Sequence, residues 1–170
     1  MNKIVHLTLF LAIVSALAGG ALAFANQLTA PVIAENNERI EKQVLLEMYP
    51  DASGDDFKAL NTDKLNSKTV QKAYKYKDLI IFNMKVSGYK DGTTFLVSIN
   101  SKDKKIDNYY AISNGDTKGL GSQVLEKPFK KGLIGKDAFG KLDTISGATV
   151  SSSPVVEGIN EASSYVDSLK

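Results

Sequence analysis

A run of small and hydroxyl-bearing residues near the carboxyl-terminal end of the sequence is the part best suited to chemistry. Small side chains let another group approach the backbone closely, and glycine permits unusual backbone angles. A helix is expected directly after this run, and the amino terminus of a helix favours phosphate through its unpaired N–H groups and its dipole. Thr149 would then present a hydroxyl where an anionic group is welcome. The run extends from Asp143 to Ser152 and contains Ser146, Gly147, Ala148 and Thr149 in succession.

The same run is also compatible with an ordinary turn and helix cap, because Ser, Gly and Thr are common turn residues in unrelated proteins. A resemblance favours the first interpretation. The pattern Asp143-x-x-Ser146-Gly147-Ala148-Thr149, followed by Ser151, resembles the recognition motif of the FMN-binding domain family. In that family an FMN transferase joins the phosphate of FMN to the threonine hydroxyl.

Other segments agree with this resemblance. Leu28-Thr29-Ala30-Pro31, Gly88-Tyr89 and Thr117-Lys118-Gly119-Leu120-Gly121 are similar to the G subunit of the Rnf electron-transport complex. They are also similar to the related C subunit of the sodium-pumping NADH:quinone reductase. The family commonly shows Glu-Thr-Pro-Gly-Leu-Gly where this chain has residues 116–121, so the rigidity of this loop is expected to differ although its two glycines are kept.

The resemblance implies FMN bound covalently to Thr149 by a phosphodiester, with Ser146, Gly147 and Ala148 around the linkage. Thr117, Gly119, Leu120 and Gly121 would form a second wall of the flavin site, or else only a surface turn. Asp143 would serve recognition by the transferase, or else only cap a turn. The flavin would supply the redox chemistry, so no catalytic residue, metal or independent catalysis is expected.

Three functions remain open at this stage. The resemblance favours an electron-carrier subunit of an ion-translocating ferredoxin:NAD oxidoreductase of the Rnf type, with the other membrane subunits as partners. A free-standing, membrane-anchored flavoprotein of extracellular electron transfer would use the same covalent FMN. An anchored binding or scaffold domain without redox activity would keep the fold and lack the flavin.

Composition excludes several other classes of protein function. The sequence has no cysteine, which removes disulfides, thiolate metal ligands and a catalytic thiol. Its 21 basic and 19 acidic residues are interspersed, so no continuous basic stripe is available for nucleic acid. With 43% hydrophobic residues the chain should build a folded core.

The amino-terminal segment predicts a membrane anchor. Residues 4–24 contain no Asp, Glu, Lys or Arg, and about 20 apolar residues span a bilayer. We favour a retained anchor over a cleaved signal peptide, because the apolar run is longer than a usual signal peptide core. Lys3 precedes the span and Glu35 and Glu38 precede Arg39 after it, so the amino terminus should be cytoplasmic. The expected domains are an anchor over residues 1–25 and an extracytoplasmic FMN-binding domain over 26–170.

The remaining sequence predicts an α+β fold, an antiparallel sheet meander with flanking helices on one face. Strands are expected over 69–76, 79–86, 93–99 and 105–112, because these runs are rich in β-branched and aromatic residues and short turns separate them. A helix should begin at Thr29 or Ala30 and end near Pro50, and residues 51–68 read as a loop or short helix. A closing helix is expected after Ser151, with Pro154 in its first turn.

Overall fold

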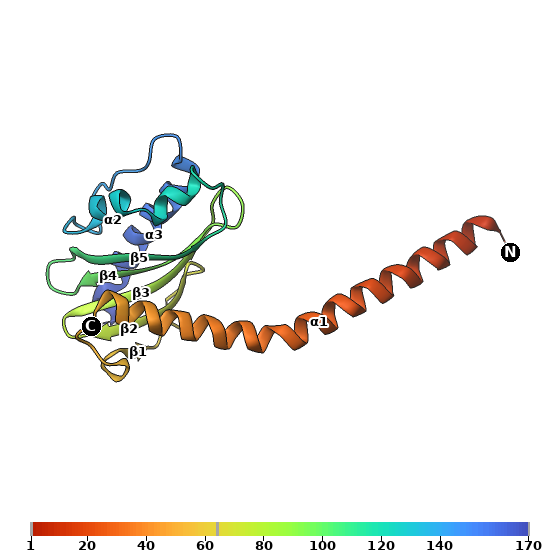
Figure 1. Ribbon diagram of the computed structural model, residues 1–170, viewed down its shortest axis with the longest axis horizontal. Coiled ribbons are helices and arrows are strands. Elements are labelled where there is room, and N and C mark those ends of the chain that lie inside the picture. The colour runs from red at the N-terminus through yellow and green to blue at the C-terminus, as the bar shows by residue number, and fades with distance from the viewer. Residues whose placement is uncertain (1, 64, 170) are drawn as a thin grey trace. The chain divides into compact units, whose positions relative to one another are not determined.

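The computed structural model describes residues 2–63 and 65–169, and the chain divides into two compact units between Lys42 and Gln43. The first unit is helical, and the second contains the sheet and the remaining helices (Figure 1). Together they confirm the predicted α+β fold with an apolar amino-terminal helix.

Helix α1 is a single element from Lys3 to Met48, 46 residues long. The separate helix expected to begin at Thr29 or Ala30 is therefore wrong, because the helix continues through Pro31. The Thr29 hydroxyl donates to the carbonyl of Ala25 at 3.0 Å, so it bonds back onto the preceding turn instead of capping a new helix. Surrounding alanine and leucine residues favour this continuity.

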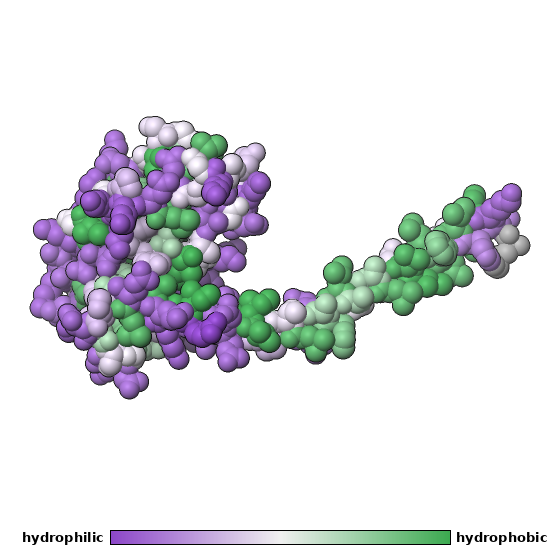
Figure 2. Space-filling view, in the orientation of Figure 1, coloured by the Kyte–Doolittle hydropathy of each residue, from purple (hydrophilic) through white to green (hydrophobic). Residues whose placement is uncertain are grey.

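By length and composition, α1 contains one candidate membrane span. Its large apolar side chains, such as Ile4, Leu11 and Leu22, are exposed, and Figure 2 shows them as a continuous hydrophobic surface. A signal sequence near an amino terminus would satisfy the same criteria. The candidate span agrees with the anchor that the sequence predicts.

The second unit contains a five-stranded antiparallel sheet in the order β1-β2-β3-β4-β5. This confirms the predicted meander. The short strand β1 lies in the segment expected to be a loop or short helix, where η1 (Gly54–Asp56) also forms. Three residues are too few for a strand period to show in the sequence. The strands are Lys58–Leu60, Val70–Tyr76, Leu79–Val86, Thr93–Asn100 and Ile106–Asn114.

One face of the sheet forms the main core with helix α3 (Thr149–Tyr165). Phe82 of β3, Phe95 of β4 and Ile159 of α3 are fully buried in this core. A Cβ atom at Gly158 would lie 3.0 Å from Val86 and 3.5 Å from Phe95, so α3 lies very close to the strands. The sheet therefore fixes where α3 lies.

The other face of the sheet is covered by the end of α1 and the residue that follows it. The Tyr49 hydroxyl donates to Asp107 Oδ2 at 2.6 Å, and Asn108 Nδ2 donates to the carbonyl of Met48 at 3.2 Å. Helices thus cover both faces, and the expectation of helices on one face only is wrong. Ile81 and Leu96 on this second face are fully buried, which explains why it requires a cover.

Three shorter elements complete the fold. They are η2 (Gly121–Leu125), α2 (Lys127–Leu133) and η3 (Val166–Leu169), and α2 was not predicted. Helix α3 begins at Thr149, before the serines that were expected near its cap, which places Pro154 inside the helix and not in its first turn. The serines at 151–153, which were expected near the helix cap, instead lie inside the helix and do not cap it.

Candidate functional site

Thr149 is the first residue of α3, and its side chain is exposed. Ala148 occupies the N-cap position and provides no side-chain hydrogen bond. The backbone N–H groups of Thr149 and Val150 have no acceptor among the residues that the structure describes, as expected for the first turn of a helix. The Thr149 hydroxyl therefore lies next to two open donors at the positive end of a helix dipole.

A tight turn leads the chain into this helix. The Ala148 N–H donates to the carbonyl of Ile145 at 3.0 Å, and Gly147 has a φ of 80°, in the left-handed region. A Cβ atom at Gly147 would meet no described residue within 4 Å. Glycine is therefore favoured here by its backbone angle and not by lack of space.

Ser152 links the turn to the helix through two hydrogen bonds. Its side chain is fully buried, accepts a hydrogen bond from the Ile145 N–H at 2.9 Å and donates to the Ala148 carbonyl at 3.0 Å. Sequence reasoning grouped Ser152 with the capping residues and missed this role. A seven-residue separation between the bonded groups leaves no pattern in the sequence that would have revealed it.

Asp143 lies on the surface, outside the turn. Its carboxylate accepts a hydrogen bond from Lys136 Nζ at 2.6 Å, and its side chain is 80% exposed. The Lys136 hydrogen bond and charge lower the pKa of Asp143 below its ordinary value. Residues 143–145 also line a cleft of about 290 Å³ with parts of η2 and α2. A charged carboxylate is thus accessible close to the Thr149 turn.

The loop over residues 117–121 is held by its own hydrogen bonds. The Leu120 N–H donates to the Thr117 carbonyl at 3.1 Å, and the Gly119 N–H donates to Ser122 Oγ at 2.8 Å. Gln123 Nε2 donates to the Gly119 carbonyl at 2.9 Å. These bonds fix the turn without a proline in the loop. Thr117, Gly119 and Leu120 are exposed, and Gly121 is buried.

The structure brings this loop against the start of α3 through Gly121. A Cβ atom at Gly121 would lie 2.4 Å from Ser151 Oγ and 2.5 Å from Asp116 Cβ. Real side chains do not approach so closely, so the contact requires glycine at this position. The two segments that the sequence singled out, 117–121 and 143–151, are therefore neighbours in the fold.

Asp116 lies at the centre of this contact, and sequence reasoning did not assign it a role. It is 9% exposed, and its Oδ1 accepts hydrogen bonds from the N–H groups of Lys90 at 2.8 Å and Gly92 at 3.4 Å. Its Oδ2 has no hydrogen-bond partner of regular geometry among the described residues. A Cβ atom at Gly88 would lie 2.3 Å from Oδ2, so Gly88 is needed to admit the carboxylate.

The charge of Asp116 is stabilised despite its burial. Burial acts to raise the pKa of Asp116, but the nearby Ser151 hydroxyl and the N–H groups of Lys90, Tyr89 and Gly92 together hold this pKa below its ordinary value. The carboxylate thereby joins the turn over residues 88–92 to the loop at 121 and to the first turn of α3. No spacing in the sequence relates Gly88 to Asp116, so sequence reasoning had no signal for this contact.

Three exposed apolar side chains stand next to the residues around Asp116. Tyr89 follows Gly88 and is 68% exposed, Leu120 precedes Gly121 and is 52% exposed, and Val150 precedes Ser151 and is 62% exposed. Exposed apolar residues that are neighbours in sequence of this contact, together with a helix start that favours phosphate, suit a flat aromatic group that carries a phosphate. The residues present thus fit FMN.

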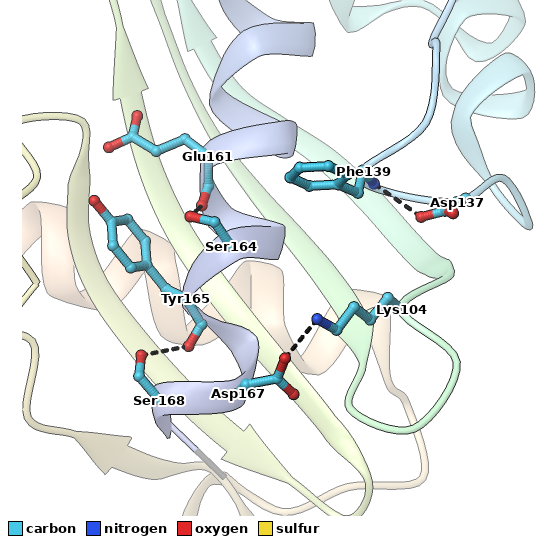
Figure 3. Close-up of polar contacts among 8 residues, drawn as sticks. All are labelled: Lys104, Asp137, Phe139, Glu161, Ser164, Tyr165, Asp167 and Ser168. Carbon is cyan, nitrogen blue, oxygen red and sulfur yellow. Dashed lines mark hydrogen bonds and ion pairs between the residues drawn. The ribbon is translucent and has the colours of Figure 1, made fainter.

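The opposite end of α3 differs in character. Lys104 and Asp167 form an ion pair at 2.5 Å just beyond this end. The side chain of Phe139, which is exposed, lies near the same end (Figure 3). Phe139 lines a cleft with Ser163 and Ser164, far along α3 from Thr149. The aromatic side chain of Tyr109 is buried in the core. Among the described residues, no cluster of three metal-ligating side chains occurs.

Residues 88–164 match the family model of the FMN-binding domain. The matched range contains the turn at 88–92, Asp116, the loop 117–121, Asp143 and Thr149. An FMN-binding domain is thus found at these residues, as the resemblance to that family implies. No curated protein matches the chain.

Proposed function

We propose that the Thr149 hydroxyl is esterified to the phosphate of FMN and that the protein is a membrane-anchored electron carrier. The observation that carries this proposal is the exposed Thr149 at the first position of α3, inside the matched FMN-binding domain. The helix start supplies open N–H donors for an anion. We expect the exposed apolar side chains of Tyr89, Leu120 and Val150 to supply a surface for a flat ring.

Each part of the site has a separate task in this proposal. Thr149 Oγ1 holds the phosphate, and the N–H groups of Thr149 and Val150 offset its remaining negative charge. Gly147 and Ser152 keep the turn in the shape that exposes the hydroxyl. Ser146 and Ala148 are small enough to leave the phosphate room, and Thr117, Gly119, Leu120 and Gly121 form the facing wall. When bound, FMN supplies the one- and two-electron chemistry.

Attachment requires an FMN transferase that recognises the folded or unfolded motif. Asp143 suits this recognition because its carboxylate is charged and exposed beside the turn. In the mature electron carrier it would have no further task. We place the FMN domain on the extracytoplasmic side, where a covalent bond prevents the loss of a cofactor that is not readily replaced there.

The Rnf-type complex is the assembly that we favour for this carrier. The motif, the loop 117–121 and the candidate span α1 all resemble its G subunit. In such a complex the other membrane subunits would exchange electrons with the flavin on Thr149, coupled to ion translocation. Co-purification with those subunits would support this assembly, and purification of a flavinylated chain alone would favour the free-standing carrier.

Thr149→Ala is the direct test of the attachment. We expect the variant to fold, because the side chain is exposed, and to lose all covalently bound flavin when co-expressed with an FMN transferase. Intact mass and ultraviolet fluorescence of the denatured band measure this, since only a covalent flavin survives denaturation. Thr144→Ala, at another exposed threonine of the same segment, is the matched control and should remain flavinylated.

Two results would overturn the proposal. A Thr149→Ala protein that still carries flavin after denaturation would show another attachment residue. A wild-type chain that stays without flavin in the presence of an active transferase, and unmodified when isolated from its native membrane, would favour the anchored scaffold domain.

A further inference from the structure

A second hollow lies along β5 and shares no lining residue with the Thr149 turn or the loop 117–121. It is a cleft of about 520 Å³ bounded by Glu47 in the last turn of α1, by residues 109–111 of β5, and by α2. Because β5 is the last strand of the sheet, its outer side is open to this cleft. Clefts of about 300–1,000 Å³ are typical of sites for small molecules.

Apolar side chains cover much of the cleft wall. Tyr110 and Ala111 come from β5, Leu125 from the end of η2, and Ile134 from the residue after α2. Leu125 and Ile134 are large hydrophobic residues that remain more than 40% exposed. A ligand with an apolar body would remove this surface from water and gain about 25 cal/mol for each Å² that it covers.

The charges on the cleft have one dominant sign. Lys127, Lys130, Lys131 and Ile134 line it and recur at the helical spacing i, i+3, i+4 and i+7. This spacing places them on one side of α2, whereas Phe129 and Leu133 of the same helix are buried in the core. None of the three lysines lies within ion-pair distance of an acidic side chain among the described residues.

Among the described residues that line the cleft, Glu47 alone is acidic, and it already accepts a hydrogen bond. Its carboxylate accepts a hydrogen bond from the Tyr110 hydroxyl at 3.0 Å. Partial burial and this hydrogen bond raise the pKa of Tyr110, so the phenol remains a donor to Glu47. Lys130 Nζ lies 5.8 Å from the centre of the Tyr110 ring. Three positive charges thus face one paired negative charge.

From the apolar wall and the uncompensated lysines, we infer that this cleft binds a small amphiphilic anion. Its ligand has an apolar ring or short chain that lies against Tyr110, Leu125 and Ile134. It also carries a carboxylate, sulfonate or phosphate that the α2 lysines contact. The inference does not depend on FMN attachment at Thr149, because the two sites share no lining residue.

Isothermal titration of the full chain in nonionic detergent tests this inference with 2-naphthoate as the probe. The Lys130→Glu/Lys131→Glu variant should bind 2-naphthoate at least about tenfold more weakly, because two attractions become repulsions. Lys58→Glu/Lys68→Glu is the matched control, since both lysines are exposed and lie outside the cleft. It should bind like the wild type, and equal melting temperatures would show that all proteins are folded.

Two related probes separate the apolar and ionic contributions. The uncharged alcohol 2-naphthalenemethanol and inorganic phosphate should both bind more weakly than 2-naphthoate, and added salt should weaken only the anions. Leu125→Ser should weaken 2-naphthoate without affecting phosphate. The inference is overturned if 2-naphthoate does not bind at millimolar concentration, or binds the charge-reversed and control variants equally.

Discussion

The two ends of α3 are attached to the domain in different ways. At the start of the helix, Ser151 lies against Gly121 and the buried Asp116, and no atom could be added between them. At the other end, Ala162 and Val166 are fully buried in the core, and an exposed ion pair joins Lys104 to Asp167 just after the helix (Figure 3). The first end requires glycine at position 121 because the side chains of Ser151 and Asp116 pack directly against its backbone. The second end combines ordinary apolar packing of Ala162 and Val166 with an ion pair that water can replace.

The largest loss of stability among these variants is expected for Gly121→Ala, at the start of α3. The added methyl would lie within 2.5 Å of both Ser151 and Asp116, and such overpacking costs up to about 3 kcal/mol. We expect lower stability, measured by thermal unfolding with near-ultraviolet circular dichroism of the tyrosines, together with reduced flavin attachment. Gly132→Ala is the control, because a methyl there meets no described residue within 4 Å and alanine stabilises a helix by about 0.5–1 kcal/mol. Equal stability of the two variants would contradict the comparison.

A smaller effect, dependent on pH, should follow from Asp116→Asn. Because folding lowers the pKa of Asp116, its charge stabilises the fold above the unfolded pKa of about 3.9, and this stabilisation is lost as the pH falls through the folded pKa. At pH 7 we expect a loss of about 1–2 kcal/mol. The difference from wild type should shrink on acidification towards pH 3.

The measurement is chemical unfolding at a series of pH values with the same tyrosine signal. Asp143→Asn is the matched control, because Asp143 is exposed and its pKa is lowered mainly by one lysine. It should leave stability nearly unchanged while it reduces flavin attachment. A constant difference between wild type and Asp116→Asn at every pH would argue against a charged Asp116.

The smallest effect is expected at the carboxyl-terminal end of α3. Lys104→Ala removes an ion pair whose partners are both at least one-third exposed, and such pairs contribute between about 0 and 1 kcal/mol. Flavin attachment to Thr149 should be unaffected, as the mass of the denatured protein would show. A loss of flavin in Lys104→Ala would mean that the two ends are coupled, and the distinction drawn between them would fail.

Much of the fold was predictable because it follows from local patterns. Strand runs separated by short turns could pair only as antiparallel neighbours, and β3 forms exactly over the expected residues 79–86. The start of α3 and the short helix α2 were harder to predict than the strands. The start of α3 depends on the Ser152 bonds to residues 145 and 148, which leave no period in the sequence. Helix α2 has only seven residues, too few to show a clear helical period.

The candidate site shows a similar division. The motif around Thr149 could be identified from its residue types, and so could the glycines of the loop 117–121. The role of Asp116 could not, because it depends on Gly88 and Gly121 leaving space for one carboxylate. Glycines separated by some thirty residues reveal such a relationship only when the chain is folded. Only the structure shows that the loop 117–121 lies against the segment 143–151.

The sequential order of the strands has a consequence for how the domain assembles. Each strand pairs with the strand before it, so the sheet can grow through short loop closures, which are fast and entropically cheap. Helix α3 follows all five strands in the chain, and its packing across β3 and β4 closes the core at long sequence separation. We therefore expect the residue at position 149 to take its final surroundings late in folding, after the sheet has formed.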